Sequence, residues 1–191
     1  MRKSDISNMP SPLSESRFVK SLSALSENLP RAGEPVKRCL APDSRVGQLT
    51  AIDFDGVKDA WCFGAFPFKC KSADALFYQN GAWHLIEFKT GSSRVESIIR
   101  KLYDSAILLV SHNVLSWEEC REMLIFISVQ VDAKDRFRYY ELRKDQGYEY
   151  ELRDIKPKQA NLDPRIPTGQ VAKKVYVMDV PDFVSYASTW E

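Results

Sequence analysis

Two acidic residues and one lysine stand close together in residues 71–91, and their types suit metal-assisted chemistry on a phosphate. Asp74 lies at the start of one β-rich run, and Glu87 and Lys89 end the next one. Side chains alternate between the two faces of a strand, so Glu87 and Lys89 share a face. Carboxylate oxygens are the ligands that Mg²⁺ takes in proteins, usually together with water and substrate phosphate. The segment therefore predicts a Mg²⁺ site with a lysine beside it.

The two runs are predicted to form a hairpin, because the Asn80-Gly81 dipeptide between them is typical of a type I′ turn. This two-residue loop fixes the register, and counting back from the turn places Asp74 directly opposite Glu87. Opposed side chains have Cβ atoms about 4.5–5.5 Å apart, where like charges destabilise the sheet. A divalent cation or the ammonium group of Lys89 would offset that repulsion.

A helix is predicted over residues 11–28, ahead of the hairpin. Ser11 suits the N-cap and Pro12 suits the first helical position. Glu15 lies near the edge of the inward face, where it would either join a site or complement the helix dipole. Apolar residues recur at helical spacing and mark that inward face: Phe18, Leu22, Leu25 and Leu29.

Further elements are predicted on both sides of the hairpin. A capping box over Ser93–Glu96 opens a helix that ends at His112–Asn113, and a second box over Ser116–Glu119 opens a short helix. The apolar run at residues 123–131 is typical of a central strand covered on both faces. The other expected elements are short strands at 49–54 and 61–68, a hairpin or helix at 137–154, a loop at 155–173, a strand at 174–180 and a helix at 181–190.

Composition predicts a soluble protein of one domain. The 191 residues are enough for a core, and 44% hydrophobic with 28% charged residues is ordinary for a globular protein. A net charge of +1 excludes a surface coated with basic residues for nucleic acid. The four cysteines lack metal-ligand spacing and predict free, buried thiols in a reducing cytoplasm. Residues 1–10 are expected to be disordered and carry no secretory signal, and no apolar run is long enough to span a membrane.

The motif Ala73-Asp74 followed by Glu87-Phe88-Lys89, then a long helix, resembles the PD-(D/E)XK nuclease superfamily. Alanine stands where that motif has its proline, a substitution common in the group. The resemblance implies an α/β (α+β) fold with a mixed central sheet, flanking helices and a restriction-endonuclease-like core. The single domain would run over residues 11–191, with its core at 11–131 and a C-terminal elaboration at 132–191.

The resemblance also implies a Mg²⁺-dependent nuclease, with Mn²⁺ as an alternative metal and DNA, before RNA, as substrate. Asp74, Glu87 and the carbonyl of Phe88 would hold the metal, and Lys89 would act at the scissile phosphate. Many such nucleases dimerise, so a homodimer is open. Glu15 would be the additional acid that many members take from their first helix. Candidate substrate contacts lie at the start of the helix after the motif: Arg94, Arg100, Lys101 and Tyr103.

Two other classes of function stay open. Residues 49–57, LTAIDFDGV, resemble the first motif of haloacid dehalogenase-like phosphatases, with Asp53 as nucleophile, Asp55 as general acid and Mg²⁺ as cofactor. That motif should follow the first strand of a doubly wound fold, whereas here a helix and an irregular stretch precede it. Asp53 and Asp55 are also typical of a polar turn or a helix cap. The third class is a nuclease fold without catalysis that binds nucleic acid or a protein, for which the tyrosines at 139, 140, 148 and 150 offer a stacking surface.

Overall fold

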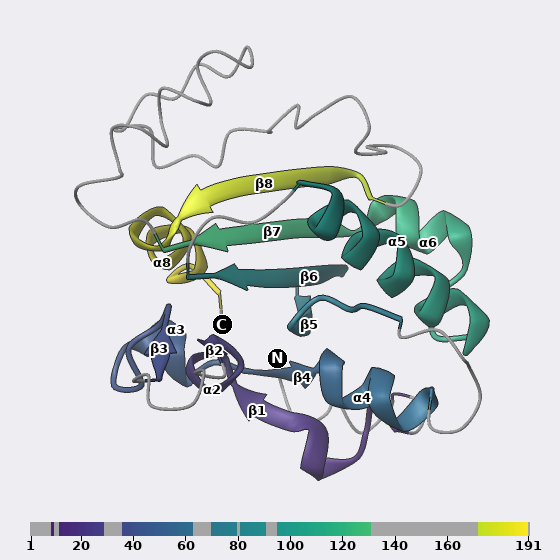
Figure 1. Cartoon of the computed structure of the whole chain (residues 1–191), viewed down its shortest axis with the longest axis horizontal. Helices are drawn as coiled ribbons and strands as arrows, with labels where there is room; N and C mark the ends of the chain where they lie inside the picture. Colours follow the sequence, from purple (N-terminus) through teal and green to yellow (C-terminus); the bar gives the residue numbers. More distant parts are fainter. Residues whose placement is uncertain are drawn as a thin grey trace.

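One mixed β-sheet forms the centre of the protein (Figure 1). The computed structural model describes residues 9, 12–28, 36–62, 70–79, 81–90, 95–130 and 172–190. Within these residues six strands lie in the order β1-β4-β5-β6-β7-β8. Their bounds are β1 (Val19–Ser21), β4 (Thr50–Asp53), β5 (Ala75–Gln79), β6 (Ala82–Lys89), β7 (Leu124–Val129) and β8 (Lys174–Asp179). The predicted mixed sheet with flanking helices is confirmed.

The sheet changes from antiparallel to parallel pairing at β6. Strands β1, β4, β5 and β6 are antiparallel to one another in turn, whereas β7 is parallel to β6 and β8 is parallel to β7. Parallel strands need a crossover connection, and α5 (Val95–Ser111) with α6 (Trp117–Glu122) supplies it between β6 and β7. Because β8 joins the same sheet, the fold continues past residue 131 into residues 172–190.

The β5–β6 hairpin has the register predicted from its turn. The ladder runs from Gln79 opposite Ala82 to Ala75 opposite Ile86. Gly81 has a φ of 77°, which is the left-handed region that glycine adopts without strain. The register prediction is therefore confirmed.

Helix α5 ends, and helix α6 begins, where the sequence predicts. Asn113 follows α5 with a φ of 55°, a conformation that commonly ends a helix. At the start of α6, Ser116 Oγ accepts a hydrogen bond from the Glu119 N–H (3.1 Å), and Glu119 Oε2 accepts one from the Ser116 N–H (2.7 Å). This is the predicted capping box.

The predicted helix over residues 11–28 is wrong. β1 instead pairs with β4 at the edge of the sheet. Ser21 Oγ accepts a hydrogen bond from the Ala24 N–H (3.3 Å), so a serine inside the expected helix starts a new one. Strand pairing and serine capping thus override the apolar spacing. The short elements that accompany β1 in this region are η1 (Ser16–Phe18), α2 (Leu22–Leu25), β2 (Glu27–Asn28), β3 (Lys37–Arg38) and α3 (Arg45–Gln48).

The strand expected at residues 61–68 is wrong for the part of it that the structure describes, residues 61 and 62. Trp61 is the last residue of helix α4 (Phe54–Trp61). The strand expected at residues 49–54 is confirmed as β4, and Asp53 at its end caps α4 by accepting a backbone N–H (3.0 Å). Alternation of apolar residues does not predict the structure at Trp61. The N-cap at Asp53 starts helix α4, and the buried face of that helix continues to Trp61.

Other predicted features lie outside the described residues. They are residues 1–8 and 10 of the expected disordered N-terminus, Asn80 of the turn, Ser93 and Arg94 of the first capping box, and residues 131–171 with their four tyrosines. Met9 is described, and it packs partly buried against the core.

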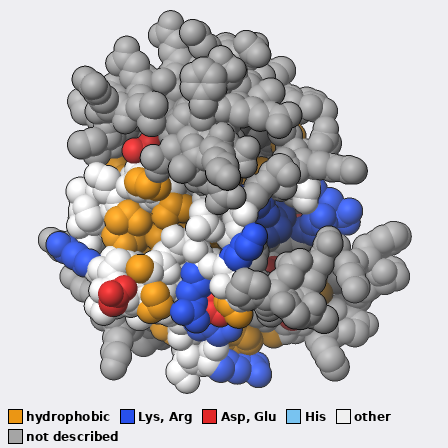
Figure 2. Space-filling model, turned by 60° about the vertical axis from the view of Figure 1, so that its left-hand side comes forward, with side chains coloured by type: hydrophobic (Ala, Val, Ile, Leu, Met, Phe, Trp, Pro, Cys, Tyr) orange, Lys and Arg blue, Asp and Glu red, His pale blue; other side chains and the backbone are white. Residues whose placement is uncertain are grey.

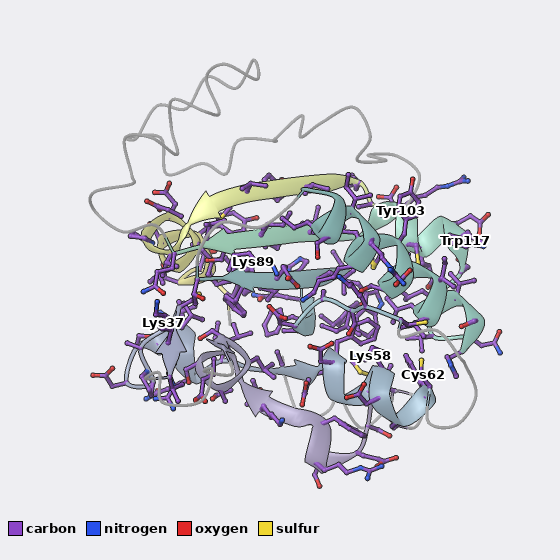
Figure 3. All side chains as sticks on the ribbon, viewed as in Figure 1. Lys37, Lys58, Cys62, Lys89, Tyr103 and Trp117 are labelled. Atoms are coloured by element: carbon purple, nitrogen blue, oxygen red, sulfur yellow. The ribbon has the colours of Figure 1, made fainter. Side chains whose placement is uncertain are left out.

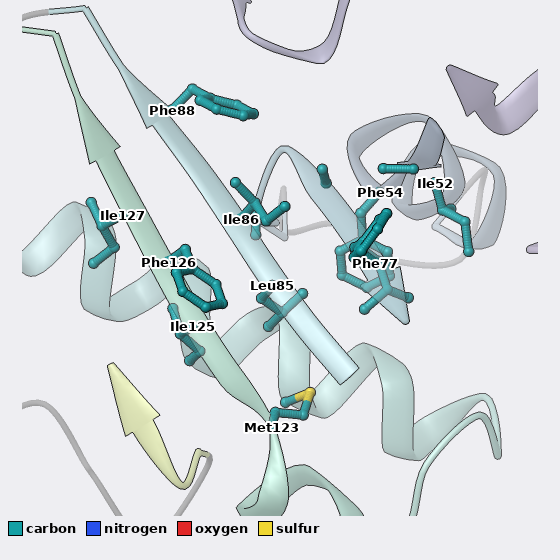
Figure 4. Close-up of a cluster of buried hydrophobic side chains, with 14 of the residues drawn as sticks. Ile52, Phe54, Phe77, Leu85, Ile86, Phe88, Met123, Ile125, Phe126 and Ile127 are labelled. Carbon is teal, nitrogen blue, oxygen red and sulfur yellow. The ribbon is translucent and has the colours of Figure 1, made fainter. Parts of the chain in front are cut away.

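The face of the sheet opposite α5 carries an aromatic core covered by α8 (Val180–Ala187). Phe88 meets Phe183 edge-on with ring centroids 5.7 Å apart, and Phe126 lies 5.3 Å from Trp190. Figure 4 shows Phe88 and Phe126 projecting from neighbouring strands β6 and β7. Six side chains of this core are at most 8% exposed: Phe77, His84, Phe88, Phe126, Phe183 and Trp190.

All four cysteines are free thiols, as predicted, but only two are buried. Cys39 and Cys120 are buried, whereas Cys62 and Cys70 are partly exposed. Among the described helices, none combines the length and the apolar character needed to cross a membrane.

Candidate functional site

The hairpin brings Asp74 and Glu87 together on the face of the sheet that α5 covers. Asp74 stands one residue before β5, and Glu87 lies near the end of β6. Asp74 Oδ2 accepts a hydrogen bond from the Phe88 N–H at 2.6 Å, which ties the aspartate to the neighbouring strand. The Glu87 side chain is 1% exposed and that of Asp74 is 20% exposed. Two carboxylates are therefore held side by side and largely out of water.

Two lysines complete a charge cluster around these carboxylates. Lys101 reaches from α5, with Nζ 3.2 Å from Asp74 Oδ1 and 2.9 Å from Glu87 Oε2. Lys89 shares the strand face with Glu87, as predicted, and its ammonium forms an ion pair with Glu87 Oε1. Asp74, Glu87, Lys89 and Lys101 together are neutral, which offsets the cost of burying each charge.

One oxygen of this cluster lacks an aligned hydrogen-bond donor. Within the described residues Glu87 Oε1 is buried and accepts no hydrogen bond. Lys101 Nζ lies 2.7 Å from it, so that contact is a close approach of charges and the directed hydrogen bond goes to Oε2. A buried carboxylate oxygen without a directed donor suits a cation that binds without directional preference.

Backbone contacts with α5 fix the segment that carries Asp74. The Ala73 N–H donates to Ser105 Oγ at 3.0 Å, and the Lys71 N–H donates to Asp104 Oδ2 at 2.9 Å. Ser105 is completely buried, so the contact lies inside the interface between α5 and the sheet. Asp74 is therefore positioned by the same helix that supplies Lys101.

Burial and charge shift the protonation of the site. Burial, followed by the nearby charge of Glu87, raises the pKa of Asp74 to about 7, although Lys101 and the Phe88 N–H act against the shift. Burial alone would lower the pKa of Lys101, but the charges of Asp74 and Glu87 outweigh burial and raise it above the usual value. Lys101 is thus a firmly held cation, whereas Asp74 is readily protonated in the absence of a divalent cation.

Cys39 lies next to the site, a placement that sequence reasoning missed. Its Sγ donates to the Lys89 carbonyl oxygen at 3.7 Å. Burial, followed by the charge of Asp74, raises the pKa of the thiol to about 12. Since the thiolate is the nucleophilic form, Cys39 is chemically inert here and serves to pack the end of β6.

The oxygen atoms of the site fit a Mg²⁺ ion in type and number. Asp74 and Glu87 offer carboxylate oxygens, and in a strand the N–H and C=O of one residue point to the same edge. Because the Phe88 N–H points to Asp74, the Phe88 carbonyl faces the same edge of β6, beyond the start of β5. Hard cations of this size bind one or two carboxylates with water and phosphate. No group of three or more His, Cys, Asp or Glu side chains with metal-binding geometry occurs in the part of the chain that is described.

The remaining predicted residues are not all gathered at this site. Glu15 precedes η1 and pairs with Arg17 at 2.7 Å, near the edge strand β1, which β4 separates from β5. The helix that should have carried Glu15 inward is absent from its described residues, so its predicted place in the site is wrong. Arg100 is 55% exposed and pairs with Asp104 at 3.5 Å.

Among the predicted substrate contacts that the structure describes, one reaches the carboxylates. Lys101 does so directly, whereas Tyr103 lies farther along α5, away from Lys89 at the end of β6 (Figure 3). Arg94 is outside the described residues. The signal for Lys101 in the sequence is its place four residues before the buried Ser105, on the inward side of α5.

The aspartates of the phosphatase-like motif have structural partners. Asp53 caps α4 and pairs with Lys20 at 2.6 Å, and Asp55 accepts a hydrogen bond from Ser72 Oγ. Strand β4 is antiparallel to both of its neighbours, unlike the first strand of a doubly wound fold. The helix-cap interpretation of Asp53 is therefore confirmed.

No family model, curated protein or solved structure matches this chain.

Proposed function

We propose that this protein is a metal-dependent nuclease that hydrolyses phosphodiester bonds in DNA or, second in order, in RNA. The observation that carries the proposal is the pair Asp74 and Glu87, opposed across a hairpin, with Lys89 on the same face at the end of β6. Paired carboxylates with an adjacent lysine suit attack of water on a phosphate.

The arrangement of elements supports a restriction-endonuclease-like core. The meander β4-β5-β6 is followed by the long helix α5 and the parallel strand β7, in the order that the PD-(D/E)XK resemblance implies. The departure is the missing first helix, which removes Glu15 from the proposed active site. The catalytic set is thereby reduced to Asp74, Glu87 and Lys89.

The chain's own residues would share the work as follows. Asp74, Glu87 and the Phe88 carbonyl would hold Mg²⁺ or Mn²⁺, and a metal bound there supplies a Lewis acid and a water of lowered pKa. Lys89 is the last residue of β6 and its side chain is about as buried as that of Lys101, so its ammonium would meet a phosphate that enters the site beside Glu87. It would neutralise the charge that builds on the phosphate as water adds and the P–O bond to the leaving oxygen breaks.

The charge on one face of the molecule supports a nucleic-acid partner. Figure 2 shows Lys and Arg side chains gathered on the side where β3 and α3 lie, with few acidic groups among them. Lys37 and Arg38 of β3 are exposed there, and Arg38 is paired with Glu27 of β2. Cys39 follows Arg38 in the chain and contacts the backbone of Lys89, so these basic side chains lie close to the site. Phosphate contacts by such a rim supply most non-specific affinity for nucleic acid. The free thiols suit a cytoplasmic setting.

The experiment that tests the proposal measures cleavage of mixed DNA and RNA substrates with Mg²⁺ or Mn²⁺. Lys89→Ala is expected to lower the rate by at least about a hundredfold, because it removes the charge at the phosphate. Lys173→Ala is the matched control, since Lys173 is 53% exposed and pairs with Glu122 ahead of β8. EDTA should abolish cleavage. Equal rates for the wild type and Lys89→Ala would reject this site as the catalytic one.

The contacts of Lys101 favour one second candidate, a nuclease fold that binds nucleic acid without cutting it. An ammonium that already satisfies both carboxylates would suit a site that takes no metal. In that case the wild type binds DNA in a filter assay, shows no cleavage with either metal, and gives no heat on titration with Mg²⁺.

A further inference from the structure

We propose that Lys101 is a built-in counter-ion that occupies the place of the divalent cation, so that metal binding requires its ammonium to leave. Lys101 would then set the metal affinity of the site and stabilise the metal-free protein. This inference rests on the proposed function, because it concerns the metal site of the proposed nuclease.

The distances support this role for Lys101 and not for Lys89. Lys101 Nζ lies 3.2 Å from Asp74 Oδ1, 2.9 Å from Glu87 Oε2 and 2.7 Å from Glu87 Oε1. Lys101 therefore joins the two carboxylates, whereas Lys89 forms its ion pair with Glu87. The Lys101 ammonium therefore occupies the position that a metal held by both acidic side chains would need.

The local structure holds Lys101 in this place. Its side chain is only 17% exposed, although lysine ammonium groups generally stay in water. One turn later, Ser105 accepts the Ala73 N–H at 3.0 Å, which docks α5 against the segment that carries Asp74. The contact thus follows from how α5 is fixed on the sheet, and it brings a positive charge to both carboxylates at once.

Charge and space make the ammonium and the metal compete. Two positive charges so close together repel each other strongly at the effective dielectric of a protein, and a divalent ion doubles the repulsion that a single charge would meet. The same oxygens cannot coordinate Mg²⁺ at its short bond lengths while they accept hydrogen bonds from Lys101. Without a metal, in turn, removing the ammonium leaves Asp74 and Glu87 to repel each other.

The test is calorimetric titration of Mg²⁺ into the full chain and its variants, combined with melting temperatures in EDTA. Lys101→Met is expected to lower the Kd for Mg²⁺ by about tenfold or more, and to lower the Tm in EDTA by several degrees. Added Mg²⁺ should restore the Tm. Lys101→Gln removes the charge but keeps a polar group, and provides a second reading if Lys101→Met does not fold.

The matched control is Arg100→Met. It removes one positive charge from the neighbouring position of α5, where the side chain is 55% exposed and pairs with Asp104. The Kd for Mg²⁺ should stay within about twofold of the wild-type value, because an exposed charge is screened by solvent.

The outcomes separate this inference from the proposed nuclease activity. If the wild type cleaves and both Lys101 variants bind Mg²⁺ with the wild-type Kd or more weakly, Lys101 is no competitor and only the inference fails. If the wild type neither binds Mg²⁺ nor cleaves while the Lys101 variants bind Mg²⁺, the inference stands and the proposed activity fails. If no variant binds Mg²⁺, the inference is overturned together with the metal site.

Discussion

The two faces of strand β6 differ in their buried side chains. One face is aromatic and apolar throughout, whereas the other carries Glu87 and Lys89 after the apolar Leu85. Towards α8, His84, Ile86 and Phe88 pack among aromatic rings, with Phe88 against Phe183 and His84 5.2 Å from Trp190. Towards α5, Glu87 and Lys89 join a charged cluster. Alternation along one strand thus separates an apolar core from a charged site by the thickness of a single sheet.

The contrast separates what stabilises the fold from what could act on a ligand. Contacts between phenylalanine rings gain dispersion and hydrophobic energy with no polar atom to satisfy, although on this face the buried Nδ1 of His84 has no hydrogen-bond partner among the described residues. Burying Asp74 and Glu87 with two lysines gives little net stability, since desolvation consumes most of the ion-pair energy. Proteins commonly break folding rules at functional sites, for example by burying charged side chains, and lose stability by doing so. The charged face is therefore the one whose sequence needs a reason beyond folding.

The largest expected effect comes from breaking the aromatic face. Phe126→Ala should lower the free energy of unfolding by about 3–5 kcal/mol, because its fully buried ring contacts those of His84, Tyr176, Trp190 and neighbouring residues. Urea denaturation measures this loss. The Kd for Mg²⁺ of the folded fraction should not change.

Phe126→Leu is the control, since it keeps most of the volume and should lose about 1.5 kcal/mol or less. A Phe126→Ala variant that melts like the wild type would show that this face is not the stabilising one.

Much of this division could be read from the sequence because its signals are local. The turn before Ala82 fixes the register of β5 on β6, and alternation then assigns each side chain to a face. The capping box at Ser116 and the apolar run of β7 likewise depend on neighbours within a few residues. The proximity of Asp74 and Glu87 follows from these rules, while their metal and their activity remain predictions.

What the sequence did not predict depends on contacts between distant segments. Val19 pairs with Ile52 in the sheet, and no local signal in residues 11–28 announces that pairing. The family resemblance assigned Lys101 to substrate, and a long side chain on a helix can adopt many rotamers. Its direction is decided by two carboxylates from other elements. Long-range partners, and not propensity, made those decisions.

The next largest effect is the pH dependence of stability that His84 confers on the aromatic face. Burial lowers the pKa of His84 to about 4 from an ordinary 6.5. Between these values the unfolded chain binds the proton and the folded protein does not, so stability is lost as the pH falls from 6.5 to 4. A shift of this size is worth about 3 kcal/mol. The urea midpoint of the wild type should fall relative to that of His84→Phe as the pH falls from 6.5 to 4, since only the wild type loses this contribution.

Asp74 on the charged face should give a slope of opposite sign. Its pKa is raised to about 7 by burial and then by Glu87, so in EDTA the folded protein binds the proton more tightly than the unfolded chain. Its contribution is complete below pH 3.8 and is lost as the pH rises to about 7. Asp74→Asn should therefore gain stability relative to wild type as the pH rises over that range. Slopes of the same sign for His84 and Asp74 would contradict the different electrostatics of the two faces.

The smallest effect is expected at the turn between β5 and β6, which fixes the register of the two strands. Gly81 has a φ of 77°, and a Cβ added there would meet no atom within 4 Å, so Gly81→Ala changes only backbone strain. It should cost about 1 kcal/mol, or a Tm lower by about 2–4 °C. Gly81→Asn should lose less, because asparagine tolerates positive φ. Equal melting of both variants would mean that the turn does not hold the register. A slip of one residue in the register would exchange the two faces and bring Glu87 among the aromatic rings. The turn at Gly81 therefore contributes little energy itself, but the register that it fixes keeps the charged side chains out of the aromatic core.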